Sequence, residues 1–289
     1  MERKRILVTA KAYPVESKKY EEVVCTAGIT DGGELIRIYP VAFRQLPMER
    51  RFKKYQWIEV DVEKRGYLDI RKESHRCNIA TLQCLEILDS EKGTWEKRKD
   101  AFLRRTKIYT DYEELLEDAT PDNPEFISLA VFRPDKIIGV SHSKIPEKKL
   151  KERRDKQENR ISQLELAFEE EILKSNPVPA RIMPYNFYYE FLDEKGRKYR
   201  NLIEDWELYS LYWNLMDDGK TEAAAIAGVK KKYFEEFADK DVCFFMGTRH
   251  KDHLVLKQKN CFSIISVFYP KKAKVEEKAK KEEQMLLDF

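Results

Sequence analysis

The segment that follows residue 246 places four cationic or imidazole side chains on one predicted loop. They are Arg249, His250, Lys251 and His253, and apolar runs at 242–246 and 262–269 flank them. Loops held by rigid strands commonly carry function, so this segment suits an anionic ligand. A metal is less favoured, because the two histidines have no third ligand near them in sequence and zinc sites need three or four. A basic hairpin without a ligand is the structural alternative.

A second set of cations alternates with aromatic residues between positions 37 and 55. Aromatic rings stack on bases and cations neutralise phosphates, so this mixture is typical of nucleic-acid binding. The alternative is that the aromatic residues belong to the core and the cations to a solvated rim. The candidate nucleic-acid-binding residues here are Arg37, Tyr39, Arg44, Arg51, Lys53 and Tyr55.

Acidic and imidazole side chains support an alternative, that the protein is a metal-dependent nuclease or a nucleotide-acting enzyme. Glu73 and His75 can share one face of a strand, and Asp205 and Glu207 precede an aromatic helix. The competing explanations are a polar strand end for the first pair and helix capping for the second. His250 and His253 complete this candidate set. No phosphate-binding glycine loop or nucleophile elbow is present, and we expect neither a cofactor nor a bound metal.

The last six residues, after a Lys- and Glu-rich stretch from position 271, are Gln-Met-Leu-Leu-Asp-Phe. They resemble the terminal peptides with which replication and repair proteins dock into a sliding clamp. The resemblance implies that Gln284, Leu287 and Phe289 are the anchors and that the charged stretch is a spacer. The alternative is an apolar end that folds back onto its own domain or onto a partner subunit.

Composition limits the class of protein. The 289 residues include 55 Lys plus Arg against 52 Asp plus Glu, so a net charge of +3 does not by itself indicate a nucleic-acid binder. The sequence shows neither an apolar run long enough for a membrane span nor a signal peptide. Five cysteines are too few, and odd in number, for a disulfide framework. We therefore expect a cytoplasmic protein.

The pattern of apolar residues predicts an α+β protein. Short alternating runs such as 56–62, where Ile58, Val60 and Val62 share one face, predict strands in the first half. Helical spacing predicts a long charged helix, and Pro177 and Pro179 follow it. The predicted parts are a β-barrel region, possibly tandem, at 1–145, a linker helix at 146–176, an α+β domain at 177–270 and a charged tail at 271–289.

The strand that begins Cys25-Thr26-Ala27-Gly28-Ile29 and the strand that contains Gly33, Ile36 and Arg37 resemble the opening strands of bacterial dual OB-domain proteins of uncharacterised function. Residues 128–134 are similar to the end of that module. The resemblance covers the N-terminal half and implies an OB-like barrel, a fold that often binds single-stranded nucleic acid.

These observations together predict a protein that binds single-stranded or processed DNA or RNA, in DNA maintenance or defence. The enzyme described above and a protein-binding adaptor with a clamp-like terminal peptide are the alternatives. The sequence does not establish whether the two predicted domains share one cleft.

Overall fold

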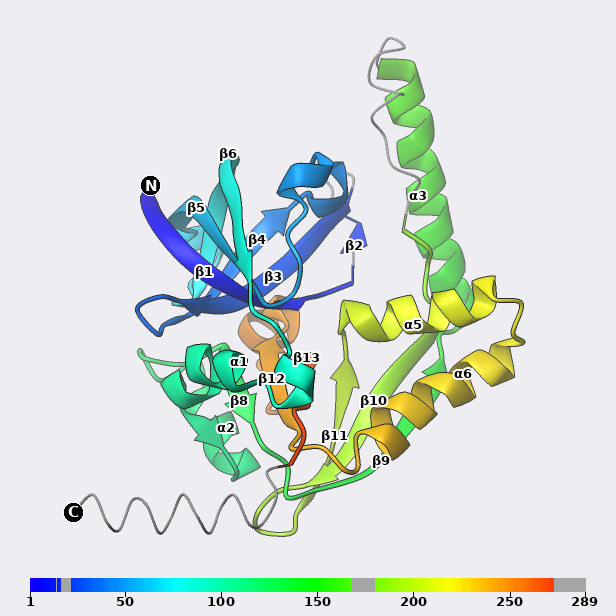
Figure 1. The fold of residues 1–289 in the computed structure, drawn as a ribbon. Helices are drawn as coiled ribbons and strands as arrows, with labels where there is room; N and C mark the ends of the chain where they lie inside the picture. The colour runs from blue at the N-terminus through cyan, green and yellow to red at the C-terminus, as the bar shows by residue number, and fades with distance from the viewer. Residues whose placement is uncertain (14, 17–21, 168–179, 273–289) are drawn as a thin grey trace, which may run out of the picture.

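Two β-sheets packed against each other form the protein (Figure 1). The computed structural model describes residues 1–13, 15–16, 22–167 and 180–272. Within those ranges, no helix combines the length and apolar character that a membrane crossing requires.

The first sheet closes into a five-stranded barrel. Its strands neighbour one another in the order β1, β5, β6, β4, β3 and back to β1, with β4 and β6 parallel and the other pairs antiparallel. This closed arrangement fits an OB-like fold, as the sequence predicts. The elements are β1 (Glu2–Lys11), β2 (Val15–Glu16), β3 (Glu22–Thr30), β4 (Leu35–Val41), η1 (Phe43–Gln45), η2 (Met48–Arg50), β5 (Gln56–Lys64), η3 (Gly66–Leu68) and β6 (Ser74–Ile87).

Alternation along β5 determines which side chains fill the barrel. Ile58, Val60 and Val62 point into its buried interior, as predicted, while Trp57 points outward and is buried against the second sheet. Where β3 crosses β1, a Cβ atom on Gly28 would overlap the carbonyl of Leu7. The close approach of these two strands therefore requires glycine at position 28.

The second sheet is mixed and has seven strands, in the order β7, β8, β12, β13, β11, β10, β9. Helices α2, α5 and α6 contribute to the apolar cluster on one of its faces. The strands are β7 (Ile108–Tyr109), β8 (Leu129–Phe132), β9 (Lys136–Lys144), β10 (Tyr185–Leu192), β11 (Lys198–Ile203), β12 (Cys243–Thr248) and β13 (Phe262–Phe268). The helices are η4 (Glu91–Gly93), α1 (Glu96–Ala101), η5 (Leu103–Arg105), α2 (Tyr112–Asp118), α3 (Glu147–Ala167), α5 (Trp206–Asp217), α6 (Glu222–Lys230), η6 (Lys231–Glu236) and η7 (Lys251–Val255).

The strand pairing corrects the predicted division of the chain at residue 145. Strands β7, β8 and β9 belong to the second sheet, where Phe132 pairs with Phe244. Helix α3 leaves this sheet after β9 and is followed by β10, the neighbour of β9, so it does not join two domains. The apolar run of β8 could not be assigned from sequence, because its partner lies far along the chain. Residues 168–176 of the predicted linker helix lie outside the described residues.

An apolar cluster joins the barrel to the second sheet. Along β12, Phe244 and Met246 face the cluster under the helices, whereas Cys243 and Phe245 face the barrel. The central strands are therefore buried on both faces, which explains why they read as continuous apolar runs. From the barrel side, Leu7, Ala10, Ala27, Ile29, Tyr55 and Trp57 enter the same cluster, together with Trp95, Phe102 and Leu103.

Replacement of Phe245 by Ala should lower the free energy of unfolding by about 3–5 kcal/mol, because it empties a space between the two sheets. Urea denaturation followed by circular dichroism measures this change. The matched control is Phe234→Ala, since Phe234 is 36% exposed and should contribute far less. The shared cluster also predicts a single cooperative transition for the wild type, and two separated transitions would contradict it.

Candidate functional site

The seven-stranded sheet and the helices that pack on it form the second domain, and a cleft of about 900 Å³ lies between this domain and the barrel. Its barrel side is the face of β3 and β4, which supplies Cys25, Arg37 and Tyr39. In OB folds this face and the adjacent loops hold the ligand. Among the described residues, those that line the cleft and are charged at neutral pH are six arginines and one carboxylate, namely Arg37, Arg65, Arg71, Arg153, Arg181, Arg249 and Glu204.

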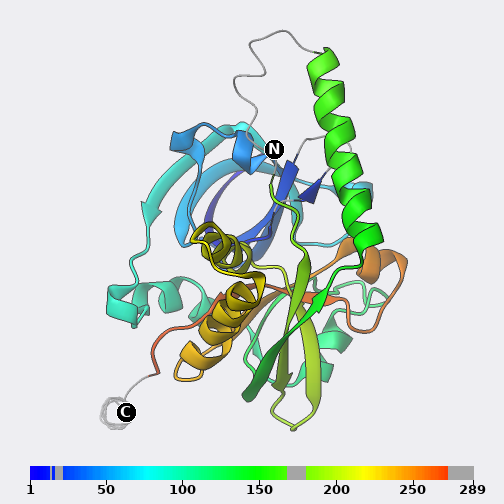
Figure 2. The ribbon, with the colours of Figure 1, turned by 90° about the vertical axis from the view of Figure 1, so that its right-hand side faces the viewer.

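The arginines reach the cleft from five separate parts of the chain. Arg37 lies on β4, and Arg65 and Arg71 lie on the loop that joins β5 to β6. Arg153 comes from α3, which projects from the second domain alongside the barrel (Figures 1 and 2). Arg181 precedes β10, and Arg249 follows β12. The fold therefore concentrates positive charge that the balanced composition of the chain conceals.

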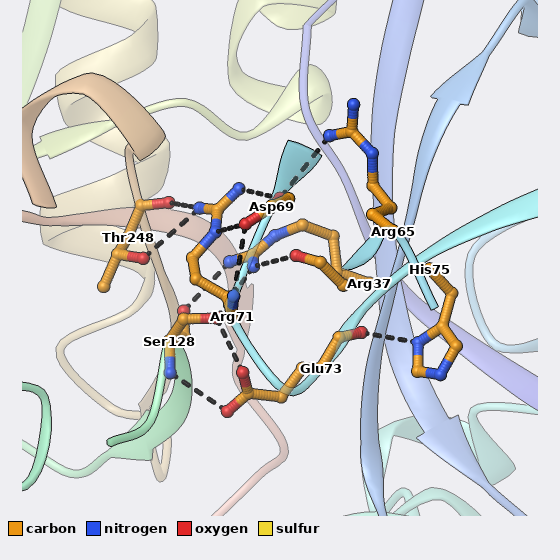
Figure 3. A network of polar contacts seen from close by, with 9 residues as sticks. Arg37, Arg65, Asp69, Arg71, Glu73, His75, Ser128 and Thr248 are labelled. Atoms are coloured by element: carbon orange, nitrogen blue, oxygen red, sulfur yellow. Dashed lines mark hydrogen bonds and ion pairs between the residues drawn. The ribbon is translucent and has the colours of Figure 1, made fainter. Parts of the chain in front are cut away.

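Arg37 forms a polar junction between the two sheets at this cleft (Figure 3). Its guanidinium is buried and donates to the hydroxyl of Ser128 at 2.8 Å and to the Ser128 carbonyl at 2.9 Å. The same hydroxyl donates to the carboxylate of Glu73 at 2.8 Å. Burial and the neighbouring Arg71 lower the pKa of Arg37. Ser128, which directly precedes β8 of the second sheet, thus contacts both a buried cation and a buried anion of the barrel.

Arg71 makes a second link between the sheets. Its guanidinium donates to both oxygens of Asp69, at 2.7 and 2.6 Å, and to the carbonyl of Thr248 at 2.7 Å. Burial acts to raise the pKa of Asp69, but the hydrogen bonds and charge of Arg71 outweigh it and hold the pKa at about 2. Arg71 is therefore a buried, paired cation that orients the loop.

Two of the predicted barrel residues, Arg37 and Tyr39, line the cleft. Tyr39 is half-buried, and the guanidinium of Arg65 lies 5.3 Å from its ring centre. Tyr55 requires a correction, because it is buried and packs edge-on against Trp95 and Phe268, so its ring cannot stack on a ligand. Three cations lie outside the described cleft lining, namely Arg44, Arg51 and Lys53.

The predicted loop after β12 also contains some residues that line the cleft and others that do not. Arg249 and His250 line the cleft, and Arg249 pairs with Asp252 at 2.7 Å. Partial burial and Arg71 lower the pKa of His250. His253 is a correction, because it is buried, its ring contacts Phe126, and its Nε2 lies 2.5 Å from the carbonyl of Ala119. Lys251 is exposed and does not line the described cleft.

The acidic residues proposed for the enzyme alternative make contacts within the fold. Asp205 is the N-cap of α5, where its side chain accepts a hydrogen bond from the backbone of Glu207. The carboxylate of Glu207 pairs with Lys54 at 2.7 Å. Glu73 belongs to the Arg37 junction, and Nδ1 of His75 bonds the Glu73 carbonyl at 2.9 Å. Among the described residues, no three His, Cys, Asp or Glu side chains gather as a metal site would require.

Four cleft arginines were absent from the sequence prediction of the binding site, namely Arg65, Arg71, Arg153 and Arg181. Arg65 and Arg71 lie on a loop, Arg153 lies on a helix and Arg181 lies shortly before a strand. No regular spacing in the sequence therefore connects the four. Arg65 and Arg71 could have been predicted from the OB-like barrel, because the loop between its fourth and fifth strands borders the ligand face. Gln284, Leu287 and Phe289 lie outside the described residues, and their docking to a clamp stays a prediction.

Comparison with family models places residues 110–287 in a domain of unknown function, DUF8757. This match covers more than half of the chain. The chain belongs to the DUF8757 family. Residues 2–104 match a second domain of unknown function, DUF8758. The residues between the two matches, 105–109, include the end of η5 and all of β7, the first strand of the second sheet along the chain.

The DUF8757 member matches no curated protein. Among solved structures it is similar to a murine DNA-binding protein bound to double-stranded DNA, at 10% identity. The alignment covers 95% of this chain and 98% of the murine chain, with a TM-score of 0.31. A similarity at that level supports no argument about fold or function, so the cleft has to be interpreted from its own residues.

Replacement of Asp69 by Asn should destabilise the protein in a pH-dependent way. The pKa of Asp69 falls from 3.8 to about 2 on folding. The carboxylate therefore stabilises the fold fully above about pH 4, by about 2.5 kcal/mol, and this contribution disappears as the pH falls towards 2. Urea denaturation of both proteins at a series of pH values measures the difference. A gap that stays constant down to pH 2 would contradict this assignment, and Asp31→Asn, at an exposed turn, is the control.

Proposed function

We propose that this protein binds single-stranded nucleic acid in the cleft between its OB-like barrel and its second domain. The observation that carries the proposal is the position of the cleft: it lies on the β3–β4 face of the barrel, and the charged residues in its described lining are six arginines and one carboxylate. That face is where OB barrels hold oligonucleotides.

The arginines suit phosphate groups. A guanidinium presents a fixed fork of donors that matches phosphate oxygens, and cations along a groove follow a nucleic-acid backbone. Arg153 is exposed and forms no ion pair within the described part of the chain, so it can contact a ligand without breaking an internal contact. Arg181 and Arg249 each pair with one carboxylate, Asp217 and Asp252, and keep further donors.

Aromatic rings in the cleft suit unpaired bases. Tyr39 lies beneath the guanidinium of Arg65, and Tyr13 packs on Tyr209 with 4.9 Å between ring centres. Tyr13 and Tyr39 line the cleft with partly exposed rings, whereas Tyr209, which also lines it, is buried and supports the ring of Tyr13. A single strand exposes the faces of its bases to such rings, whereas a duplex keeps them stacked, so the cleft favours single strands.

A pair of neighbouring residues on α3 provides the test. Arg153 lines the cleft, whereas Arg154 does not and pairs with Glu147. Arg153→Ala should weaken binding of a labelled single-stranded DNA or RNA about five- to tenfold and reduce the slope of log Kd against log salt by about 1. Arg154→Ala should change both quantities much less. Fluorescence anisotropy at several salt concentrations measures them.

Both variants change exposed residues of one helix, so their thermal stabilities should match that of the wild type. Equal losses of affinity in the two variants would contradict binding in the cleft and indicate a diffuse attraction to the basic helix. Absence of binding to every single-stranded oligonucleotide would contradict the proposed function itself. Duplexes of the same sequence should bind more weakly than the single strands.

A further inference from the structure

Glu204 is the only carboxylate among the described residues that line this cationic cleft. It follows the last residue of β11 and directly precedes Asp205, the N-cap of α5. Its backbone is held on both sides, because its N–H donates to the carbonyl of Ile264 at 2.8 Å and its carbonyl accepts from Tyr13 at 3.3 Å. The backbone of Glu204 is therefore held in place beside the cleft.

Glu204 does not neutralise any of the cleft arginines. Arg71, Arg181 and Arg249 are paired with Asp69, Asp217 and Asp252 respectively. Glu204 itself makes no ion pair within the described residues. A carboxylate in a cleft for phosphates weakens their binding, so its charge needs another explanation.

The local structure does not require the negative charge either. One oxygen of Glu204 accepts a hydrogen bond from the hydroxyl of Ser263, which also contacts the carbonyl of Gly247 at 3.3 Å. A glutamine at position 204 could accept the same hydrogen bond through its amide oxygen. The second carboxylate oxygen has no hydrogen-bond partner among the described residues. That oxygen is free to accept from a ligand.

We propose that Glu204 reads bases that carry an exocyclic amino group, so that the cleft prefers cytosine over uracil. This inference rests on the proposed function, because it assigns a specificity to the same cleft. A carboxylate accepts a hydrogen bond from the N4 amino group of cytosine. Uracil presents a carbonyl oxygen at that position, which the carboxylate repels. Ser263 acts as a positioning residue that orients the carboxylate.

The test compares oligo(dC) with oligo(dU), each about eight nucleotides long, by fluorescence anisotropy at pH 8. The two ligands share one backbone and differ in the group that Glu204 would contact. The wild type should bind oligo(dC) at least about fivefold more tightly. Glu204→Gln should reduce this ratio to one or below, because the amide NH2 that replaces the free carboxylate oxygen donates to the uracil carbonyl and cannot accept from the cytosine amino group. Glu207→Gln, at a neighbouring carboxylate outside the described cleft lining, should leave the ratio unchanged.

The outcomes separate this inference from the proposed function. Salt-sensitive binding of both oligonucleotides with equal affinity by the wild type would overturn the role of Glu204 while leaving the cleft as a binding site. A preference for cytosine that survives in Glu204→Gln would also overturn it. Failure of both oligonucleotides to bind would remove the proposed function and this inference together. The comparison within the wild type does not depend on how well any variant folds.

Discussion

The apolar contact between the barrel and the second sheet is the constraint on which the rest of the structure depends. Leu7, Trp57 and Tyr55 from the barrel share one cluster with Phe245 and Phe268 from the sheet. Burial of this much aromatic and aliphatic surface holds the two sheets in one orientation. The cleft lies at their junction, so its width and the separation of its arginines follow from this packing.

Buried polar contacts then fix the cleft in detail. A buried guanidinium is costly unless it is paired, and here Ser128 connects Arg37 to Glu73 while Asp69 pairs with Arg71. These two arginines are therefore held in place before any ligand arrives. The more exposed Arg153 can adjust. A cleft that combines buried, fixed cations with an exposed, adjustable one suits a flexible polyanion.

Local pattern predicted much of the fold, but little of the site. The alternation of Ile58, Val60 and Val62 identifies a barrel strand, and the capping role that the sequence offered for Asp205, as the alternative to an acidic site, is the one the structure shows. Pairing between distant strands, such as Phe132 with Phe244, leaves no local trace, so the division of the chain was misplaced. The cleft arginines were missed for the same reason. Tyr55 was predicted at a surface because cations precede it, whereas its ring enters the core between the sheets.

The most direct test of the central claim is photo-crosslinking of a single-stranded oligonucleotide that carries halogenated pyrimidines, followed by mass spectrometry of the crosslinked peptides. Binding in the cleft predicts crosslinks at Tyr39 and Tyr13, whose side chains line it from the barrel and from the chain after β1. Crosslinks confined to residues outside the described cleft lining, such as the partly exposed Phe234 on η6, would contradict the account.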